Sequence, residues 1–199
     1  MSDQAVTTPD STVPLCVDLD GTLINTDLLW ESMLQLIRQN PLWLPALPFW
    51  WLRGRANLKR QIAARVELDA ATLPYHEHFL EFLRAAKRSG RPLILATASD
   101  RELAQRVADY VGLFSEVMGS DGQTNLRGRT KLDCLTQRFG HRGFDYAGNS
   151  SVDLPVWRAA REAIVVNASD KLVKRVAQVT KVAAVFPPVP VRPRLSGNT

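Results

Sequence analysis

Two hydrophobic spacings alternate along the chain. Short apolar runs of strand length recur in it, and they begin at residues 14, 92, 116, 144, 163 and 182. Between these runs the apolar residues recur every three or four positions, for example in residues 28–38, 101–111 and 131–139, which is the period of an amphipathic helix. Strands that alternate with helices are typical of a parallel sheet with helices on both faces. The pattern therefore predicts an α/β fold with a doubly wound parallel sheet.

One interval between two predicted strands is much longer than the others. Residues 27–90 separate the first strand from the second and contain helical periodicity of their own. We predict that they form a helical cap inserted into a core made of residues 14–26 and 91–186. Residues 1–13 are polar and residues 187–199 are rich in proline, so we expect a disordered lead-in and a mobile tail.

A tryptophan-rich segment lies inside this insertion. Residues 41–52 contain Trp43, Trp50 and Trp51, and three prolines in the same segment argue against one uninterrupted helix. Cationic residues follow directly, and the segment is too short to cross a bilayer. It is either the small core of the cap or a hydrophobic surface that binds a lipid-like substrate, a bilayer or a partner protein.

Composition restricts the partners of the protein more than its fold. The 199 residues are 45% hydrophobic and 23% charged, and a formal net charge of +5 favours anionic partners. The sequence has no basic helix interleaved with aromatic residues, so we do not expect a nucleic-acid partner. Cys16 and Cys134 occupy predicted core positions, which fits a reducing, cytoplasmic setting. A cap that binds lipid would add a peripheral position at the inner membrane surface.

Two acids interrupt the first predicted strand at its carboxyl end. Asp18 and Asp20 follow an apolar run, and Gly21 and Thr22 come directly after them. Buried acids are costly unless a cation or a reacting group needs them. Because side chains alternate along a strand, Asp18 and Asp20 point the same way while the strand geometry lasts. Isolated stretches of this kind also occur as solvated Asp-Gly turns, so the interpretation depends on partners elsewhere in the chain.

Three further segments supply such partners. A second apolar run ends in Thr97 and Ser99, Lys131 lies near the start of a helix, and Asn149 and Asp153 follow a third strand. Together with Asp-Leu-Asp-Gly-Thr, this set resembles the haloacid dehalogenase (HAD) superfamily of phosphotransferases, whose four motifs occur in the same order. The resemblance covers nearly the whole predicted core. More narrowly, Leu-Ala-Thr-Ala-Ser-Asp and Tyr-Ala-Gly-Asn-Ser are similar to stretches of the HAD domains often joined to membrane prenyltransferases.

The resemblance implies a phosphoryl-transfer site. Asp18 would be the nucleophile that forms an aspartyl-phosphate, and Asp20 would give a proton to the leaving alcohol and later take one from the attacking water. Thr97 would donate a hydrogen bond to a phosphoryl oxygen, and Lys131 would supply fixed positive charge. Ser99 is either a contact on the substrate side or a hydroxyl at a helix start. The other expected substrate contacts are Gly21, Thr22, Trp50 and Trp51.

The same resemblance implies a Mg2+ cofactor with oxygen ligands from Asp18, Asp20, Asn149 and Asp153. In the family, the second acid of the first motif contributes its backbone carbonyl. The family usually has Asp at the position of Asn149, and an amide oxygen binds a cation without contributing a formal charge. We therefore expect weaker metal binding here. Asp153 would then either support the water shell of the metal or hold Lys131.

These observations lead to one main prediction and two alternatives. The main prediction is a Mg2+-dependent phosphomonoester hydrolase that acts on a phosphorylated small molecule or lipid, with an apolar leaving group indicated by the tryptophans of the cap. The first alternative is a non-catalytic accessory module that docks on a membrane prenyltransferase through the cap. The second is a response-regulator-like receiver, which the D-x-D-G-T spacing and the long insertion disfavour.

Overall fold

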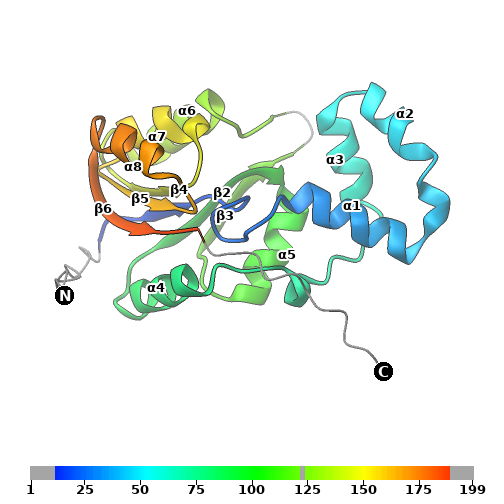
Figure 1. Ribbon diagram of the computed structural model, residues 1–199, viewed down its shortest axis with the longest axis horizontal. Helices are drawn as coiled ribbons and strands as arrows, with labels where there is room; N and C mark the ends of the chain where they lie inside the picture. Colours follow the sequence, from blue (N-terminus) through cyan, green and yellow to red (C-terminus); the bar gives the residue numbers. More distant parts are fainter. Residues whose placement is uncertain (1–11, 122–123, 189–199) are drawn as a thin grey trace.

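A six-stranded sheet forms the centre of the computed structural model, which describes residues 12–121 and 124–188 (Figure 1). The strands are, in chain order, β1 (Leu15–Val17), β2 (Leu93–Asp100), β3 (Glu116–Ser120), β4 (Asp145–Gly148), β5 (Glu162–Val166) and β6 (Lys181–Phe186). They lie in the order β3-β2-β1-β4-β5-β6, and each neighbouring pair is parallel. The predicted lead-in and tail lie outside the described residues, apart from residues 12–13 and 187–188.

Helices cover both faces of this sheet. α4 (Glu77–Arg88) and α5 (Arg101–Val111) lie on one face, whereas α6 (Arg129–Phe139), α7 (Leu154–Ala159) and α8 (Asp170–Ala177) lie on the other (Figure 1). The alternation of side chains along β1 divides the core accordingly, since Leu15 and Val17 pack with α4 and α5 and Cys16 packs with α6 and α7. The predicted doubly wound parallel sheet is confirmed.

The strand order creates a switch point at the centre of the sheet. From β1 the chain moves outward to β2 and β3, then returns to β4 on the other side of β1 and continues to β5 and β6. Ligands of open α/β sheets collect at the carboxyl ends of strands beside such a point. Asp18 follows β1, Thr97 and Ser99 lie near the end of β2, and Asn149 follows β4. The topology therefore brings the strand-end motifs to one edge of the sheet.

Local sequence signals set the helix ends around this edge. The Asp27 carboxylate accepts hydrogen bonds from the backbone N–H groups of Leu29 and Trp30 and so caps α1 (Leu28–Gln39). Asp100 caps α5 in the same way, and α5 ends at Gly112, whose φ of 69° is the left-handed conformation that glycine tolerates best. These caps fix where the elements begin beside the ends of the strands.

The inserted residues 27–90 divide into two structural parts. The three helices α1 (Leu28–Gln39), α2 (Ala46–Leu52) and α3 (Arg55–Ala63) lie together beyond the end of the sheet, and we call them the cap (Figure 1). The short 3-10 helix η1 (Pro41–Trp43) connects α1 to α2, and a second one, η2 (Ala70–Thr72), follows α3. In contrast, α4 packs on the sheet, where the rings of Phe79 and Phe186 lie 5.2 Å apart.

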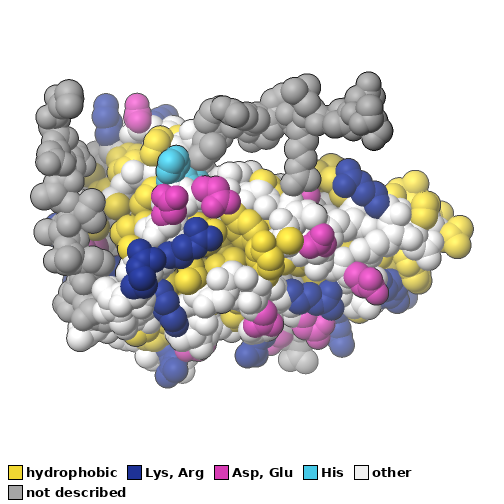
Figure 2. Space-filling view, turned by 90° about the horizontal axis from the view of Figure 1, so that it is seen from below, with side chains coloured by type: hydrophobic (Ala, Val, Ile, Leu, Met, Phe, Trp, Pro, Cys, Tyr) yellow, Lys and Arg dark blue, Asp and Glu magenta, His cyan; other side chains and the backbone are white. Residues whose placement is uncertain are grey.

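The tryptophan-rich segment contains both a small core and an exposed apolar surface. Trp50 is 7% exposed, and its ring lies 5.7 Å from that of Trp43 and 5.1 Å from the Arg65 guanidinium. On other sides of α2 the side chains of Trp51 and Leu52 are 56% and 83% exposed. Figure 2 shows hydrophobic side chains gathered at the end of the molecule that holds the cap. Within the described ranges, no helix has the length and apolarity needed to span a membrane.

Candidate active site

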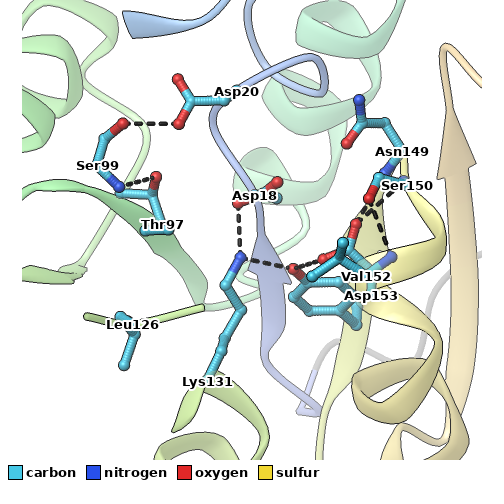
Figure 3. Close-up of polar contacts among 12 residues, drawn as sticks. Asp18, Asp20, Thr97, Ser99, Leu126, Lys131, Asn149, Ser150, Val152 and Asp153 are labelled. Atoms are coloured by element: carbon cyan, nitrogen blue, oxygen red, sulfur yellow. Dashed lines mark hydrogen bonds and ion pairs between the residues drawn. The ribbon is translucent and has the colours of Figure 1, made fainter. Parts of the chain in front are cut away.

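A buried ion pair lies at the carboxyl end of β1. Lys131, in the first turn of α6, donates a hydrogen bond from Nζ to Oδ1 of Asp18 at 2.7 Å, and both residues are less than one-tenth exposed (Figure 3). A charged ammonium is costly to bury unless anions surround it. The arrangement fixes the orientation of the Asp18 carboxylate and places a positive charge at the edge of the sheet.

Tyr146 extends this pair into a network that the sequence did not predict. Its hydroxyl accepts a hydrogen bond from Lys131 at 2.9 Å and donates one to Oδ1 of Asp153 at 3.0 Å. Oδ2 of Asp153 accepts the backbone N–H groups of Asn149 and Ser150. Burial and the charge of Asp18 raise the pKa of Asp153 to about 6. Asp153 therefore holds the loop after β4 and is linked to Lys131 through Tyr146.

Asp20 lies on the other side of Asp18 and has partners of its own. Its Oδ2 accepts a hydrogen bond from the Ser99 hydroxyl at 2.6 Å (Figure 3). Its Oδ1 accepts the backbone N–H of Leu28 at 2.7 Å. Burial, followed by the charge of Asp18, raises the pKa of Asp20 to about 6. A carboxyl group with a pKa near neutrality can both give and take a proton.

The glycines of this site are required by close contacts. Gly21 has a φ of 73°, and a Cβ at this position would lie 2.1 Å from the side-chain nitrogen of Asn149. A Cβ at Gly148 would lie 2.9 Å from Oδ2 of Asp153. Only a residue without a side chain allows approaches this close. Gly21 therefore sets the spacing between the acidic turn and the loop after β4, and Gly148 leaves room for the Asp153 carboxylate beside the end of β4.

Asn167 fixes the acidic turn from the end of β5. Its side-chain amide donates hydrogen bonds to the carbonyl of Gly21 at 2.9 Å and to Oδ1 of Asn25 at 2.7 Å. Asn167 itself has a φ of 51°, a conformation that Asn tolerates better than most residues. The sequence showed only an Asn at the end of a predicted strand, and no local pattern indicated this contact.

The acids open into a pocket of about 300 Å³ between the sheet edge and the cap. Its walls include Asp18, Asp20, Lys131, Asn149 and Asp153 from the core, together with Lys59 from α3. Lys59 Nζ donates a hydrogen bond to the carbonyl of Ala98 at 2.6 Å, so the cap contacts the end of β2 directly. The structure thus brings five of the predicted site residues into one cavity and adds Lys59.

Other predicted site residues lie outside the walls of this pocket. Thr97 is fully buried, and its hydroxyl accepts the backbone N–H of Ser99 at 2.9 Å. Thr22 is also fully buried, and its hydroxyl has no hydrogen-bond partner in the part of the chain that the structure describes. Trp50 belongs to the core of the cap, whereas Trp51 lines a separate apolar groove. Ser99 acts on the site through its contact with Asp20.

The donor atoms of the site fit a hard cation such as Mg2+. Asp18, Asp20 and Asp153 place three acids around one pocket, and burial, followed by the charge of Asp18, raises the pKa values of Asp20 and Asp153. The described residues contain no cluster of three His, Cys, Asp or Glu side chains arranged around a metal position. Both Asp153 oxygens are already hydrogen-bonded. Asp18, Asn149 and the backbone carbonyl of Asp20 would hold a cation, and Mg2+ would complete such a set with water.

The chain is similar to known proteins in sequence and in fold. Residues 15–158 match the model of the haloacid dehalogenase-like hydrolase family. An uncharacterized protein of Sinorhizobium fredii (strain NBRC 101917 / NGR234), y4nM, is 39% identical over 157 residues. The match covers 79% of this chain but 30% of that protein, so the chain spans less than a third of the relative's length.

Solved structures show the same fold at low sequence identity. A protein of unknown function from Bordetella pertussis Tohama I superposes with a TM-score of 0.61 at 17% identity, over 87% of this chain and 97% of that one. A phospho-aspartyl intermediate analogue of phosphoserine phosphatase gives a TM-score of 0.57 at 13% identity, over 89% of this chain and 94% of that one. From the matching family model, supported by the fold and the order of the motifs, the chain belongs to the haloacid dehalogenase-like hydrolase family.

Proposed function

We propose that this protein is a Mg2+-dependent phosphomonoester hydrolase that acts through an aspartyl-phosphate on Asp18. The observation that carries the proposal is the pairing of Asp18 with Lys131 at 2.7 Å, next to a second acid whose pKa is about 6. Attack by a carboxylate on a phosphate dianion needs positive charge nearby and a proton source for the leaving group. The site has a residue suited to each need.

In the first step, an Asp18 oxygen attacks phosphorus, and the bond from phosphorus to the leaving oxygen breaks. Asp20, in its protonated form, gives its proton to the leaving alkoxide, so that an alcohol departs. Ser99 and the backbone N–H of Leu28 hold the Asp20 carboxyl in place for this transfer. Lys131 keeps the Asp18 carboxylate oriented during attack. Mg2+, when bound, would offset the repulsion between the carboxylate and the phosphate.

In the second step, water attacks the phosphorus of the aspartyl-phosphate. Asp20, now a carboxylate, takes a proton from this water, and the bond between phosphorus and the Asp18 oxygen breaks to release inorganic phosphate. Asp18 returns to its carboxylate form and Asp20 to its acid form. The pKa of about 6 for Asp20 suits both directions of proton transfer near neutral pH.

The cap is proposed to choose the substrate. Lys59 of α3 lines the pocket, and apolar side chains of α1 and α2 line a groove next to it. This arrangement supports a substrate that is a small-molecule or lipid phosphate with an apolar leaving group. Thr97 remains a proposed hydrogen-bond donor to the phosphoryl group, because its hydroxyl proton is not used by the bond that it accepts from Ser99.

The test is hydrolysis of an aryl phosphate with and without Mg2+ by the wild type and by Asp18→Asn. We expect turnover that needs Mg2+ and is lost in Asp18→Asn. Asp133→Asn is the matched control, since Asp133 is an exposed acid on α6, the same helix that carries Lys131. Equal turnover by Asp18→Asn and Asp133→Asn would exclude the mechanism.

A second candidate function is favoured by the exposed apolar side chains of the cap. Leu42 and Leu52 are each 83% exposed, and the chain spans only 30% of its Sinorhizobium relative. A non-catalytic module that docks on a membrane enzyme such as a prenyltransferase, at a membrane surface inside the cell, would cover such residues. This candidate predicts no turnover across a broad phosphate-ester panel. It also predicts retention in a membrane fraction that Leu42→Asp with Leu52→Asp abolishes.

A further inference from the structure

An apolar groove of about 510 Å³ lies between the three helices of the cap. Trp30 and Met33 from α1, Leu47 and Trp51 from α2, and Leu58 from α3 form most of its walls. Trp30 and Trp51 are each more than half exposed, whereas tryptophan side chains are highly buried on average. A groove of this size and apolarity is within the range that holds small organic ligands.

This groove begins where the acidic pocket ends. Asp27 lines both cavities, and its carboxylate is held at the start of α1 by the backbone N–H groups of Leu29 and Trp30. The next residue, Leu28, donates its N–H to Oδ1 of Asp20 at 2.7 Å. The first turn of α1 therefore contacts the proposed proton donor with one residue and lines the groove with its neighbours.

The position of Asp20 decides which part of a substrate lies beside the first turn of α1. A group that donates a proton to the leaving oxygen must lie within hydrogen-bond distance of that oxygen. The rest of the leaving group then continues from Asp20 past the first turn of α1. Apart from Asp27 at the junction, the groove beyond this turn is lined by apolar side chains, so it offers a hydrocarbon chain a site that water fills poorly.

We infer that the groove between α1, α2 and α3 binds the apolar chain of the leaving group, so that the preferred substrate is the monophosphate of a long-chain alcohol. This inference rests on the proposed phosphatase function and names the substrate class for the same site. Trp30 and Trp51 bind the chain in the groove. Trp50 has no such role, because it is buried in the core of the cap against Trp43 and Arg65.

The test is a series of n-alkyl monophosphates from butyl to decyl, assayed with Mg2+ below the concentrations at which they form micelles. Burial of a methylene group strengthens binding by up to about fourfold, so we expect kcat/KM to rise about twofold to fourfold per methylene until the groove is filled. Trp51→Ala and Trp30→Ala are expected to flatten this dependence. Phe49→Ala is the matched control, because Phe49 is an aromatic residue of α2 that is 54% exposed and does not line the groove.

The outcomes separate this inference from the proposed function. Turnover that depends on Asp18 but not on chain length would overturn the groove assignment and leave the phosphatase mechanism standing. Loss of the chain-length dependence in Phe49→Ala as well as in Trp51→Ala would overturn it too, as would activation only above the micelle concentration. Binding gives a readout without turnover, since decyl phosphate should bind Asp18→Asn at least tenfold more tightly than butyl phosphate in calorimetry. Equal affinities would contradict the inference.

Discussion

Replacement of Lys131 by Met tests the charge balance of the site. The Lys131 and Asp18 side chains are only 4% and 12% exposed, and their charged atoms lie 2.7 Å apart. Met keeps most of the length and volume of the lysine stem but removes the ammonium, its bond to Asp18 and its bond to the Tyr146 hydroxyl. The Asp18 carboxylate would then remain beside Asp20 and Asp153 without a cation.

The burial of this ion pair sets the size of the expected effect on stability. Removal of one partner from a buried ion pair costs about 3–5 kcal/mol, because the other charge is left uncompensated. For a chain of this length, 1 kcal/mol corresponds to about 2–4 °C in Tm, so Lys131→Met should unfold roughly 10 °C below the wild type. Phosphatase activity should fall by about 100-fold or more, since a fixed positive charge at the reacting centre is lost.

Lys181→Met is the matched control for this experiment. Lys181 also forms a short ion pair, with Glu162 at 2.6 Å, but its side chain is 73% exposed. Exposed pairs of this kind contribute about 1 kcal/mol or less, so Tm should change by a few degrees at most and activity should be unchanged. Thermal unfolding by circular dichroism and a phosphate-release assay measure both effects. Equal Tm values for Lys131→Met and Lys181→Met would refute the reasoning, because burial would then make no difference.

Three more predictions follow from other contacts of the site. The pKa values of Asp20 and Asp153 are raised from 3.8 to about 6, so the folded state binds protons more tightly than the unfolded state across this window. The contribution of these two acids to stability therefore falls as pH rises from about 4 to about 6. Mg2+ should accordingly raise Tm more at about pH 7 than at about pH 5, as measured by calorimetric scans. An equal rise in Tm at the two pH values would count against a cation among these acids. Asn149→Asp adds a carboxylate at the pocket, so the variant should have a lower Tm without metal and bind Mg2+ about tenfold more tightly in calorimetric titration. Unchanged Mg2+ affinity would show that Asn149 does not contact the cation. Asn167→Ala removes the bonds to Gly21 and Asn25 and places alanine at a φ of 51°, so it should lower Tm by a few degrees and also lower kcat. Unchanged kinetics would show that the turn does not need this support.

The parallel sheet with helices on both faces and the placement of the acids at a strand end could be predicted because their signals are local. Alternating spacings located the strands and helices, and the acids at the end of the β1 run had to lie at the switch point of a parallel sheet. The predicted helix at residues 101–111 coincides with α5, since Asp100 and Gly112 mark both of its ends. The second predicted run ends in Thr97 and Ser99, and β2 continues to Asp100 because Asp100 still pairs with Ser120 of β3.

The rest of the site depends on contacts between distant residues. From the sequence, Tyr146 is expected to be a strand residue of the core. Its contact with Lys131 arises only because residues of α6 and β4 pack in the same part of the core. Asn167 reaches Gly21 across 146 positions of the chain. Trp50 and Trp51 are neighbours in sequence, yet the turn of α2 directs one into the core of the cap and leaves the other exposed. Composition alone could not separate these two roles.

The most direct test of the account is to trap the phosphorylated enzyme. The protein is mixed with substrate and Mg2+, quenched in acid within the first turnovers and reduced with borohydride, which converts an aspartyl-phosphate to homoserine. We predict that peptide mapping by mass spectrometry finds homoserine at position 18 in the wild type and at no acidic position in Asp18→Asn. Turnover of the substrate with unmodified Asp18, or with homoserine at another acid, would contradict the central claim.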